Sequence, residues 1–229
     1  MKNYHKNLIF VSDRPYRLYM KRFISFFSAI LLSLPAFCSD SLTVFNRIRI
    51  DQDIDQSSQR LVISGLEKAL ASDADYVMLD LDTYGGALNA ADSIRSAILR
   101  FEKPVIAFVN MQAASAGALI SIACDSIYMK TGASIGAATV VNQTGEVMAD
   151  KYQSFMRGMM RATAEAKGRD PKIAESMTDT ANVLSMTPTE AVAVGYCEGI
   201  CESEYEVAAK VTGGNEFVIK NMEDDMTWL

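Results

Sequence analysis

The sequence predicts an α/β protein with a mainly parallel sheet. Short runs rich in β-branched and aromatic residues, such as 76–81 and 105–109, alternate with longer segments whose apolar residues recur every three or four positions. Helical crossovers between successive strands make those strands parallel. With 229 residues, 49% of them hydrophobic, the chain can bury one substantial core, so we expect one domain behind an N-terminal leader.

Residues 1–38 form the predicted leader. Lys21 and Arg22 follow a second candidate start at Met20 and precede an apolar run over 23–34, and Pro-Ala-Phe-Cys-Ser follows that run. That run is shorter than the roughly 20 residues that a membrane-spanning helix needs. We expect a signal peptide cut near Cys38, with an uncleaved anchor or a buried first helix as alternatives. The protein would then be exported, and be periplasmic or membrane-associated on the extracytoplasmic side.

The strands and helices are predicted from their periodicity and their end signals. Pro104 precedes one strand, glycines follow several elements, and Thr187 with Glu190 makes a capping box around Pro188. Strands are expected at 42–50, 76–81, 105–109 and 126–129, and helices at 59–72, 88–101, 119–123, 150–167, 187–195 and 203–211, with a further helical piece after 171. The domain would cover 39–215, with a solvated C-terminal tail at 216–229.

The helix expected at 150–167 carries one apolar stripe. Its members are Tyr152, Phe155, Met156, Met159, Met160 and Ala164. Methionine and aromatic residues at helical spacing are typical of a packed core, and we interpret the stripe in that way rather than as a set of cofactor contacts. Lys151 begins this helix next to the stripe, but not on it.

Charge and histidine content exclude several kinds of site. Six of the 22 Lys and Arg residues and one of the 28 Asp and Glu residues lie in the leader, which leaves a net charge of −11 for the rest of the chain. Such a body repels phosphate backbones, so we expect no nucleic-acid partner. The single histidine, His5, lies in the leader, so the body can build neither a Ser-His-Asp triad nor a His-ligated metal site. We expect no metal and no cofactor.

Three cysteines follow the leader. In an oxidising compartment Cys197 and Cys201 could form a disulfide, which would leave Cys124 buried as a small apolar residue. The alternative is three free thiols, and no cysteine is a candidate nucleophile without a base nearby.

The segment 110–119 has the features of a nucleophile site. Ser115 lies between the strand at 105–109 and the helix at 119–123, and its neighbours are alanine and glycine. Small neighbours let a second chain approach, and the free N–H groups of a first helical turn favour negative charge. The alternative is that Ser115 only caps the helix. Ser121 and Ser134 are other candidate nucleophiles, but neither lies at a strand-to-helix junction.

Two backbone N–H groups could stabilise an oxyanion beside Ser115. Gly86 and Ala116 each follow a strand and precede a helix, and rigid backbone donors stabilise a developing charge by about 3 kcal/mol each. Without histidine the base would be a lysine, which can serve when desolvation lowers its pKa far below about 10.4. Lys151 is our candidate, and Lys130 and Lys167 are competitors in positions typical of solvated side chains.

Four motifs in order resemble one family. They are Asp82-Thr83-Tyr84-Gly85-Gly86, Ala113-Ala114-Ser115-Ala116-Gly117, Gly132-Ala133-Ser134-Ile135-Gly136-Ala137 and the lysine of the Lys151 helix. Together they are similar to the serine-protease domain of NfeD-type membrane proteases, in the Clp-protease/crotonase superfamily and related to signal peptide peptidase A. The resemblance covers about 42–211.

The resemblance implies a fold and an activity. The fold would be the superfamily's spiral of β-β-α units, usually in a homo-oligomer. Ser115 would be the nucleophile and Lys151 the general base, with the N–H groups of Gly86 and Ala116 as oxyanion donors and with Gly85 and Tyr84 contacting substrate. We expect an exported serine endopeptidase that cuts near apolar residues, in membrane-protein or signal-peptide segments, and a stomatin-like membrane partner.

One departure from the family pattern keeps other functions open. Tyr84 stands where the family usually has proline, which could loosen the oxyanion loop or move an aromatic ring into the substrate groove. Membrane attachment is expected through the leader rather than through segments after the domain. The alternatives are a catalytically inactive oligomeric scaffold for a membrane partner and a crotonase-like acyl-thioester enzyme.

Overall fold

The computed structural model describes residues 42–222, and the predicted leader lies outside this range. Within it, eight strands form one sheet in the order β6-β5-β3-β2-β1-β8, and β4 pairs with β3 and β7. All strand pairs are parallel except β5 with β6. The strands are β1 (Thr43–Ile50), β2 (Tyr76–Thr83), β3 (Val105–Ala114), β4 (Ser126–Met129), β5 (Ser134–Gly136), β6 (Ser185–Met186), β7 (Gly199–Ile200) and β8 (Phe217–Asn221). The predicted mainly parallel α/β sheet is confirmed.

The helices follow the strands in the predicted alternation. They are α2 (Gln56–Ala71), α3 (Leu88–Arg100), α4 (Ala116–Ala123), α5 (Asp150–Ala166), α6 (Pro171–Ser176), α7 (Pro188–Ala193) and α8 (Glu204–Val211). Helix α2 begins three residues earlier than expected, because Asp55 and Ser58 form a capping box. The predicted capping box of Thr187 and Glu190 begins α7, with Pro188 at its first turn.

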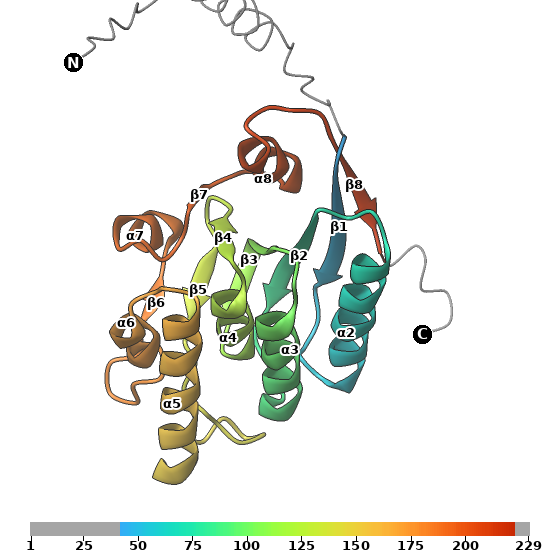
Figure 1. The fold of residues 1–229 in the computed structure, drawn as a ribbon. Coiled ribbons are helices and arrows are strands. Elements are labelled where there is room, and N and C mark those ends of the chain that lie inside the picture. Colours follow the sequence, from blue (N-terminus) through green and yellow to red (C-terminus); the bar gives the residue numbers. More distant parts are fainter. Residues whose placement is uncertain (1–41, 223–229) are drawn as a thin grey trace, which may run out of the picture. The chain divides into compact units, whose positions relative to one another are not determined.

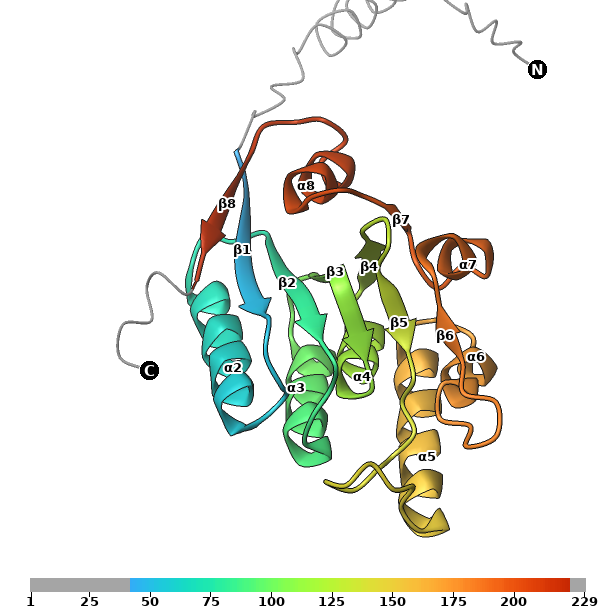
Figure 2. The same ribbon diagram turned by 180° about the vertical axis from the view of Figure 1, so that it is seen from behind.

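The two faces of the sheet are covered unequally. Helices α2, α3, α4 and α5 lie along one face, and their amino ends lie at the edge where β2 and β3 end (Figures 1 and 2). Because side chains alternate along a strand, Phe45, Met78 and Phe108 point to the other face, where Val207 and Ala208 of α8 cover them. Ligands of open α/β sheets bind at the carboxyl ends of the strands, so that edge is the place to look for a site.

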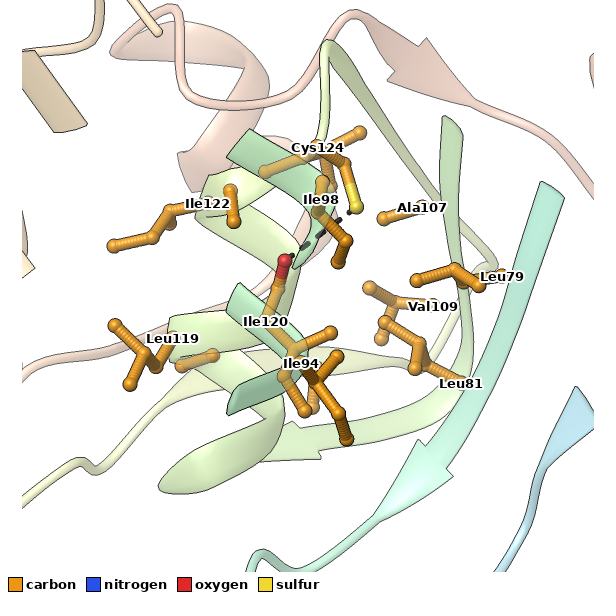
Figure 3. Close-up of a cluster of buried hydrophobic side chains, with 14 of the residues drawn as sticks. Leu79, Leu81, Ile94, Ile98, Ala107, Val109, Leu119, Ile120, Ile122 and Cys124 are labelled. Atoms are coloured by element: carbon orange, nitrogen blue, oxygen red, sulfur yellow. Dashed lines mark hydrogen bonds between the residues drawn. The ribbon is translucent and has the colours of Figure 1, made fainter. Parts of the chain in front are cut away.

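Helix α4 is buried along its whole length. Figure 3 shows its isoleucines and leucine against side chains of α3, β2 and β3, with the Cys124 thiol donating a hydrogen bond to the Ile120 carbonyl at 3.4 Å. The residues in this contact include Leu79, Leu81, Ile94, Ile98, Ala107, Val109, Leu119 and Ile122, all 1% exposed or less. Packing on every side fixes the amino end of α4, and with it residue 115.

Four strands, β5 to β8, lie where the sequence indicated none, and two of them change the picture most. β5 forms inside the expected loop at 132–138, because Ser134–Gly136 pairs with Gln112, Ala113 and Ala114, and this pairing extends β3 five residues beyond 109. β8 lies in the segment expected to be a solvated tail. It pairs with β1, so residues 217–221 belong to the sheet.

The apolar stripe of α5 is core only in part. Met156, Met159, Met160 and Ala164 are buried, as expected. Tyr152 and Phe155 are 39% and 59% exposed, so their interpretation as core residues was wrong. Among residues 42–222 we find no helix that is long and apolar enough to cross a membrane.

The three cysteines within residues 42–222 are free thiols. Cys124, Cys197 and Cys201 are all buried and unpaired, so the disulfide considered for Cys197 and Cys201 is not formed. The Cys197 thiol instead donates a hydrogen bond to the Gly199 carbonyl at 3.1 Å.

Candidate active site

Ser115 occupies the predicted junction between a strand and a helix. It follows β3 directly and is the N-cap residue of α4, with φ 53° and ψ −113°. Its side chain makes no capping hydrogen bond, and in residues 42–222 no group is bonded to its hydroxyl. Positive φ in a non-glycine residue is a strained conformation that is enriched at functional sites. The alternative that Ser115 only caps the helix does not account for this geometry.

The backbone around Ser115 is held on both sides. Its N–H donates to the Gly136 carbonyl at 2.8 Å, and its carbonyl accepts from Leu119 N–H at 3.2 Å. Gly136 has φ 137°, and a methyl group there would lie 2.4 Å from the Leu184 carbonyl oxygen. Sequence reasoning noted this glycine loop but missed its role, which is to fix the strained residue in place.

The Asp82–Gly86 turn packs directly on the serine. A Cβ on Gly85 would lie 2.6 Å from Ser115 Cβ and 3.2 Å from Ser115 Oγ. The Thr83 hydroxyl accepts from Gly85 N–H at 3.1 Å, and a Cβ on Gly117 would lie 2.8 Å from Thr83 Cγ2. Only glycine fits at positions 85 and 117, so the 82–86 turn packs directly against Ser115 and the first turn of α4.

Both expected oxyanion donors line the same cleft as Ser115. Ile54 accepts from Ala87 N–H and donates to the Gly85 carbonyl, each at 2.7 Å, in a parallel bridge around Gly86. That pattern turns the N–H of Gly86 away from Ile54, and no group in residues 42–222 accepts from it. Ala116 lies in the first turn of α4, where N–H groups have no partner within the helix. The two groups are therefore available to a ligand.

The cleft beside Ser115 is large and mostly apolar. It has a volume of about 960 Å³, and its lining includes Tyr84, Gly86 and residues 137–143. Its further lining residues are Asp53, Ile54, Asp55, Ala87, Leu88, Ala116, Met148, Tyr152, Met156 and Val183. Asp55 caps α2, and the bond from Ser58 N–H lowers the pKa of its carboxyl. The described lining contains no basic side chain, so its charge is acidic.

Lys151 lies at the rim of the site but does not touch the serine. It is in the first turn of α5, at the sheet edge where α4 also begins (Figure 1). Its side chain is exposed, and its Nζ lies 4.8 Å from the ring centroid of Tyr152, which lines the cleft. No hydrogen bond joins Lys151 Nζ to Ser115 Oγ among the described residues. The structure thus brings Ser115, Gly85, Gly86, Ala116 and Tyr84 together. Lys151 is not part of the cleft lining, but its sequence neighbour Tyr152 is.

The competing candidates have other partners. The Ser121 hydroxyl donates to the Gly117 carbonyl at 2.8 Å inside α4, and the Ser134 hydroxyl donates to Gln112 at 2.7 Å. Lys130 donates to Asn110 at 3.4 Å, and Lys167 pairs with Asp125 at 2.7 Å. None of the four lines the cleft.

A family model for the N-terminal domain of NfeD1b matches residues 44–220. The chain belongs to this family. It is 32% identical over 167 residues to the membrane protein NfeD1b of Bacillus subtilis, and this alignment covers 68% of this chain and 38% of that protein. It is 31% identical over 148 residues to the membrane-bound protease PH1510 of Pyrococcus horikoshii, and this alignment covers 61% of this chain and 33% of that protein. The chain therefore spans less than half the length of these relatives.

Solved structures agree with the fold of an NfeD1b N-terminal domain. A lysine-to-alanine variant of the 1510-N membrane-bound stomatin-specific protease, in complex with a substrate peptide, superposes with a TM-score of 0.72 at 24% identity, covering 80% of this chain and 92% of that one. ClpP1 from Listeria monocytogenes gives a TM-score of 0.58 at 20% identity, covering 69% and 92%. At these identities the likeness concerns the fold, and the expected Clp-like architecture is confirmed.

Proposed function

We propose that this NfeD1b-type domain is a serine endopeptidase with Ser115 as nucleophile and Lys151 as general base. The observation that carries the proposal is the hydroxyl of Ser115, which is unbonded within the described residues and held at a strained junction against Gly85. The N–H groups of Gly86 and Ala116 would bind the oxyanion. The relative PH1510 is named a membrane-bound protease, and the chain is 31% identical to it over the aligned part, which supports this reaction class.

The reaction follows from these roles. The neutral amine of Lys151 takes the proton of the Ser115 hydroxyl as Oγ attacks the scissile carbonyl carbon. The resulting oxyanion accepts hydrogen bonds from the backbone N–H groups of Gly86 and Ala116. The ammonium then gives its proton to the leaving amine, and the C–N bond breaks to leave an acyl ester on Ser115. Water, deprotonated by the same amine, hydrolyses that ester and restores the serine.

This mechanism requires Lys151 to leave the ring of Tyr152. The lysine stem has four rotatable carbon–carbon bonds, and a cation–π contact at an exposed site is worth only about 0.5–1 kcal/mol. Tyr152 is itself part of the cleft lining, so a peptide that covers the ring would displace the ammonium toward the serine. Catalytic hydrogen bonds often tighten only when substrate is bound.

The substrate proposed is an apolar peptide segment. Most of the cleft lining is aliphatic or aromatic, and Tyr84 and Val141 are 78% and 48% exposed beside it. Apolar side chains of a substrate would cover this surface. We further propose that these segments come from membrane proteins or leftover signal peptides, that the domain works as a homo-oligomer on the extracytoplasmic side of a membrane, and that a stomatin-like protein is a partner. The name of the 1510-N protease, specific for stomatin, supports the last point.

Hydrolysis of a quenched-fluorescence peptide of valine, leucine and alanine tests the proposal. Ser115→Ala, Lys151→Ala and Lys151→Arg should each lose activity by at least about a hundredfold. The matched controls are Ser154→Ala, an exposed serine of α5, and Lys172→Ala, an exposed lysine of α6, and both should keep it. Full activity of Ser115→Ala would end the proposal.

The inactive scaffold is a second candidate, favoured by the resting position of Lys151 over Tyr152. It predicts that a fluorophosphonate probe does not label Ser115 in the wild-type protein. Labelling that is lost in Ser115→Ala and kept in Ser154→Ala would eliminate the scaffold hypothesis. Turnover of an acyl-thioester that survives Ser115→Ala would instead indicate the crotonase-like alternative.

A further inference from the structure

One buried polar side chain beside the cleft has no role in the chemistry above. Gln153 lies in the first turn of α5, two residues after Lys151, and is 2% exposed. Its Oε1 accepts from Val140 N–H at 3.1 Å. Its Nε2 donates to the Val140 carbonyl at 2.6 Å and to the Met148 carbonyl at 3.2 Å. All three hydrogen bonds join Gln153 to Val140 or Met148, which are the first and last residues of the loop 140–148.

That loop forms a wall of the cleft. Met148 N–H donates to the Val140 carbonyl at 3.0 Å, Asn142 N–H donates to the Glu146 carbonyl at 2.9 Å, and Val141 bridges Val147. Residues 140–148 therefore form a small hairpin, and Gln153 binds its base. Without Gln153, the N–H of Val140 would have no partner among the described residues.

The hydrogen bonds of Val140 fix the orientation of its neighbour. Backbone groups alternate in direction along an extended segment, so those of Val141 point away from Gln153. Neither the N–H nor the carbonyl of Val141 has a partner among the described residues, and Val141 lines the cleft. Gln153 thus bonds one edge of the segment as a neighbouring strand would, and leaves the other edge open.

We propose that Gln153 is a positioning residue for substrate: it holds residues 139–142 extended, so that a peptide in the cleft can bond to the open backbone edge at Val141. The inference rests on the proposed function, since it assigns a role in binding the same peptide. An amide suits this place because it both accepts and donates. A carboxylate only accepts, and lysine only donates. Gln153 also ties this wall to the helical turn that bears Lys151.

Peptide binding to a protein that cannot turn over isolates the positioning role. In the Ser115→Ala background, a fluorescein-labelled peptide of valine, leucine and alanine is titrated by anisotropy. Adding Gln153→Ala should weaken the Kd by about tenfold or more, while adding Ser154→Ala should leave it unchanged. Thermal unfolding of each variant checks that the domain is folded. A Kd within about twofold of the parent, or no binding by the parent, overturns the proposal.

Gln153→Glu adds a readout that a packing role would not change. The ionised carboxylate still accepts from Val140 N–H but donates to neither carbonyl, whereas the protonated carboxyl has one O–H to donate. Binding by this variant should therefore tighten as pH falls, and binding by Gln153→Ala should not. A Kd that does not change with pH in Gln153→Glu contradicts the proposal.

The two proposals can fail separately. If the wild-type protein hydrolyses no peptide while binding depends on Gln153, the protease proposal fails and the positioning role remains. If the wild type hydrolyses the peptide and the Kd does not change in Gln153→Ala, the positioning proposal fails and the protease proposal remains.

Discussion

Gly85 faces the side chain of Ser115 so closely that a methyl group on its Cα would lie 2.6 Å from Ser115 Cβ. Gly85→Ala must therefore displace the serine or the turn that carries Gly86. Because losing one oxyanion donor costs about a hundredfold or more in rate, we expect peptide hydrolysis to fall by at least that factor. Initial rates and fluorophosphonate labelling of Ser115 measure the effect.

Gly132→Ala is the matched control for Gly85→Ala. Gly132 also has positive φ, +85° against +118°, but nothing lies within 4 Å of the added methyl. Both variants carry backbone strain of about 1–2 kcal/mol, and only Gly85→Ala contacts the site. Equal activity of the two variants would show that the contact between Gly85 and Ser115 is unimportant for catalysis.

Arg169 should be a major stabilising residue at the end of α4 opposite Ser115. It is 7% exposed, donates to the Cys124 carbonyl at 2.9 Å and pairs with Glu198 at 3.4 Å. Glu198 is 40% exposed, so the ion pair is only partly buried, but removing Arg169 also leaves the buried carbonyl of Cys124 without this donor. An unsatisfied buried acceptor costs about 1–3 kcal/mol, so Arg169→Ala should lower the free energy of unfolding by about that amount. Arg161 pairs with Glu175 at 2.8 Å, but both side chains are 41% exposed. Arg161→Ala should cost less than about 1 kcal/mol in the same urea titration.

Asp80 gives the fold a pH dependence of defined sign. Burial raises the pKa of its carboxyl above the ordinary 3.8, although the charges of Arg47 and Arg49 oppose the shift. Between the unfolded and the folded pKa the native state binds more protons, so this residue's contribution to stability falls as pH rises. Asp80→Asn does not titrate. The unfolding free energy of wild type minus that of Asp80→Asn should therefore fall from about pH 4 upward and then level off. A difference that increases over this window would refute the assignment.

The thiols should be free but unreactive in the native protein. Burial raises the pKa of Cys124 to about 12 and that of Cys197 to about 11, and the thiolate is the nucleophilic form. Iodoacetamide at about pH 8 should leave these thiols unmodified in the native protein. After denaturation it should modify them even when no reductant is added. Mass spectrometry of the peptides that contain Cys197 and Cys201 is the measurement. Alkylation that requires prior reduction would establish the disulfide that the structure lacks.

The sequence was sufficient for features that depend on local signals. Periodicity and caps gave β1, β2, β4, α3 and α5 to within a few residues, and small residues between a strand and a helix indicated Ser115. β5 and β8 were missed because each is short and is set by a partner strand distant in sequence, β3 and β1. Pairing of this kind leaves little trace in a local pattern.

The sequence did not predict which side chains around the cleft are buried, because burial there also depends on contacts with residues distant in sequence. The helical period put Tyr152 and Phe155 with the buried methionines, yet both are exposed, and Tyr152 lines the cleft rather than the core. Lys151 and Gln153 are separated by one residue, and only the fold decides that Gln153 is buried and Lys151 exposed. No pattern in the sequence indicated Gln153.

Tyr84 should bind substrate rather than loosen the oxyanion loop. Its side chain is 78% exposed at the cleft, and the bonds of Ile54 to Gly85 and Ala87, each at 2.7 Å, already fix the turn. Tyr84→Ala should therefore raise KM for an apolar peptide about threefold to tenfold and change kcat less than about twofold, because the ring adds apolar contact area to the bound peptide. Tyr205→Ala, which removes a ring of 62% exposure on α8, is the matched control and should alter neither constant. Tyr84→Pro separates the two explanations: if the tyrosine loosened the loop, proline would raise kcat, and if the ring contacts substrate, proline would raise KM as alanine does.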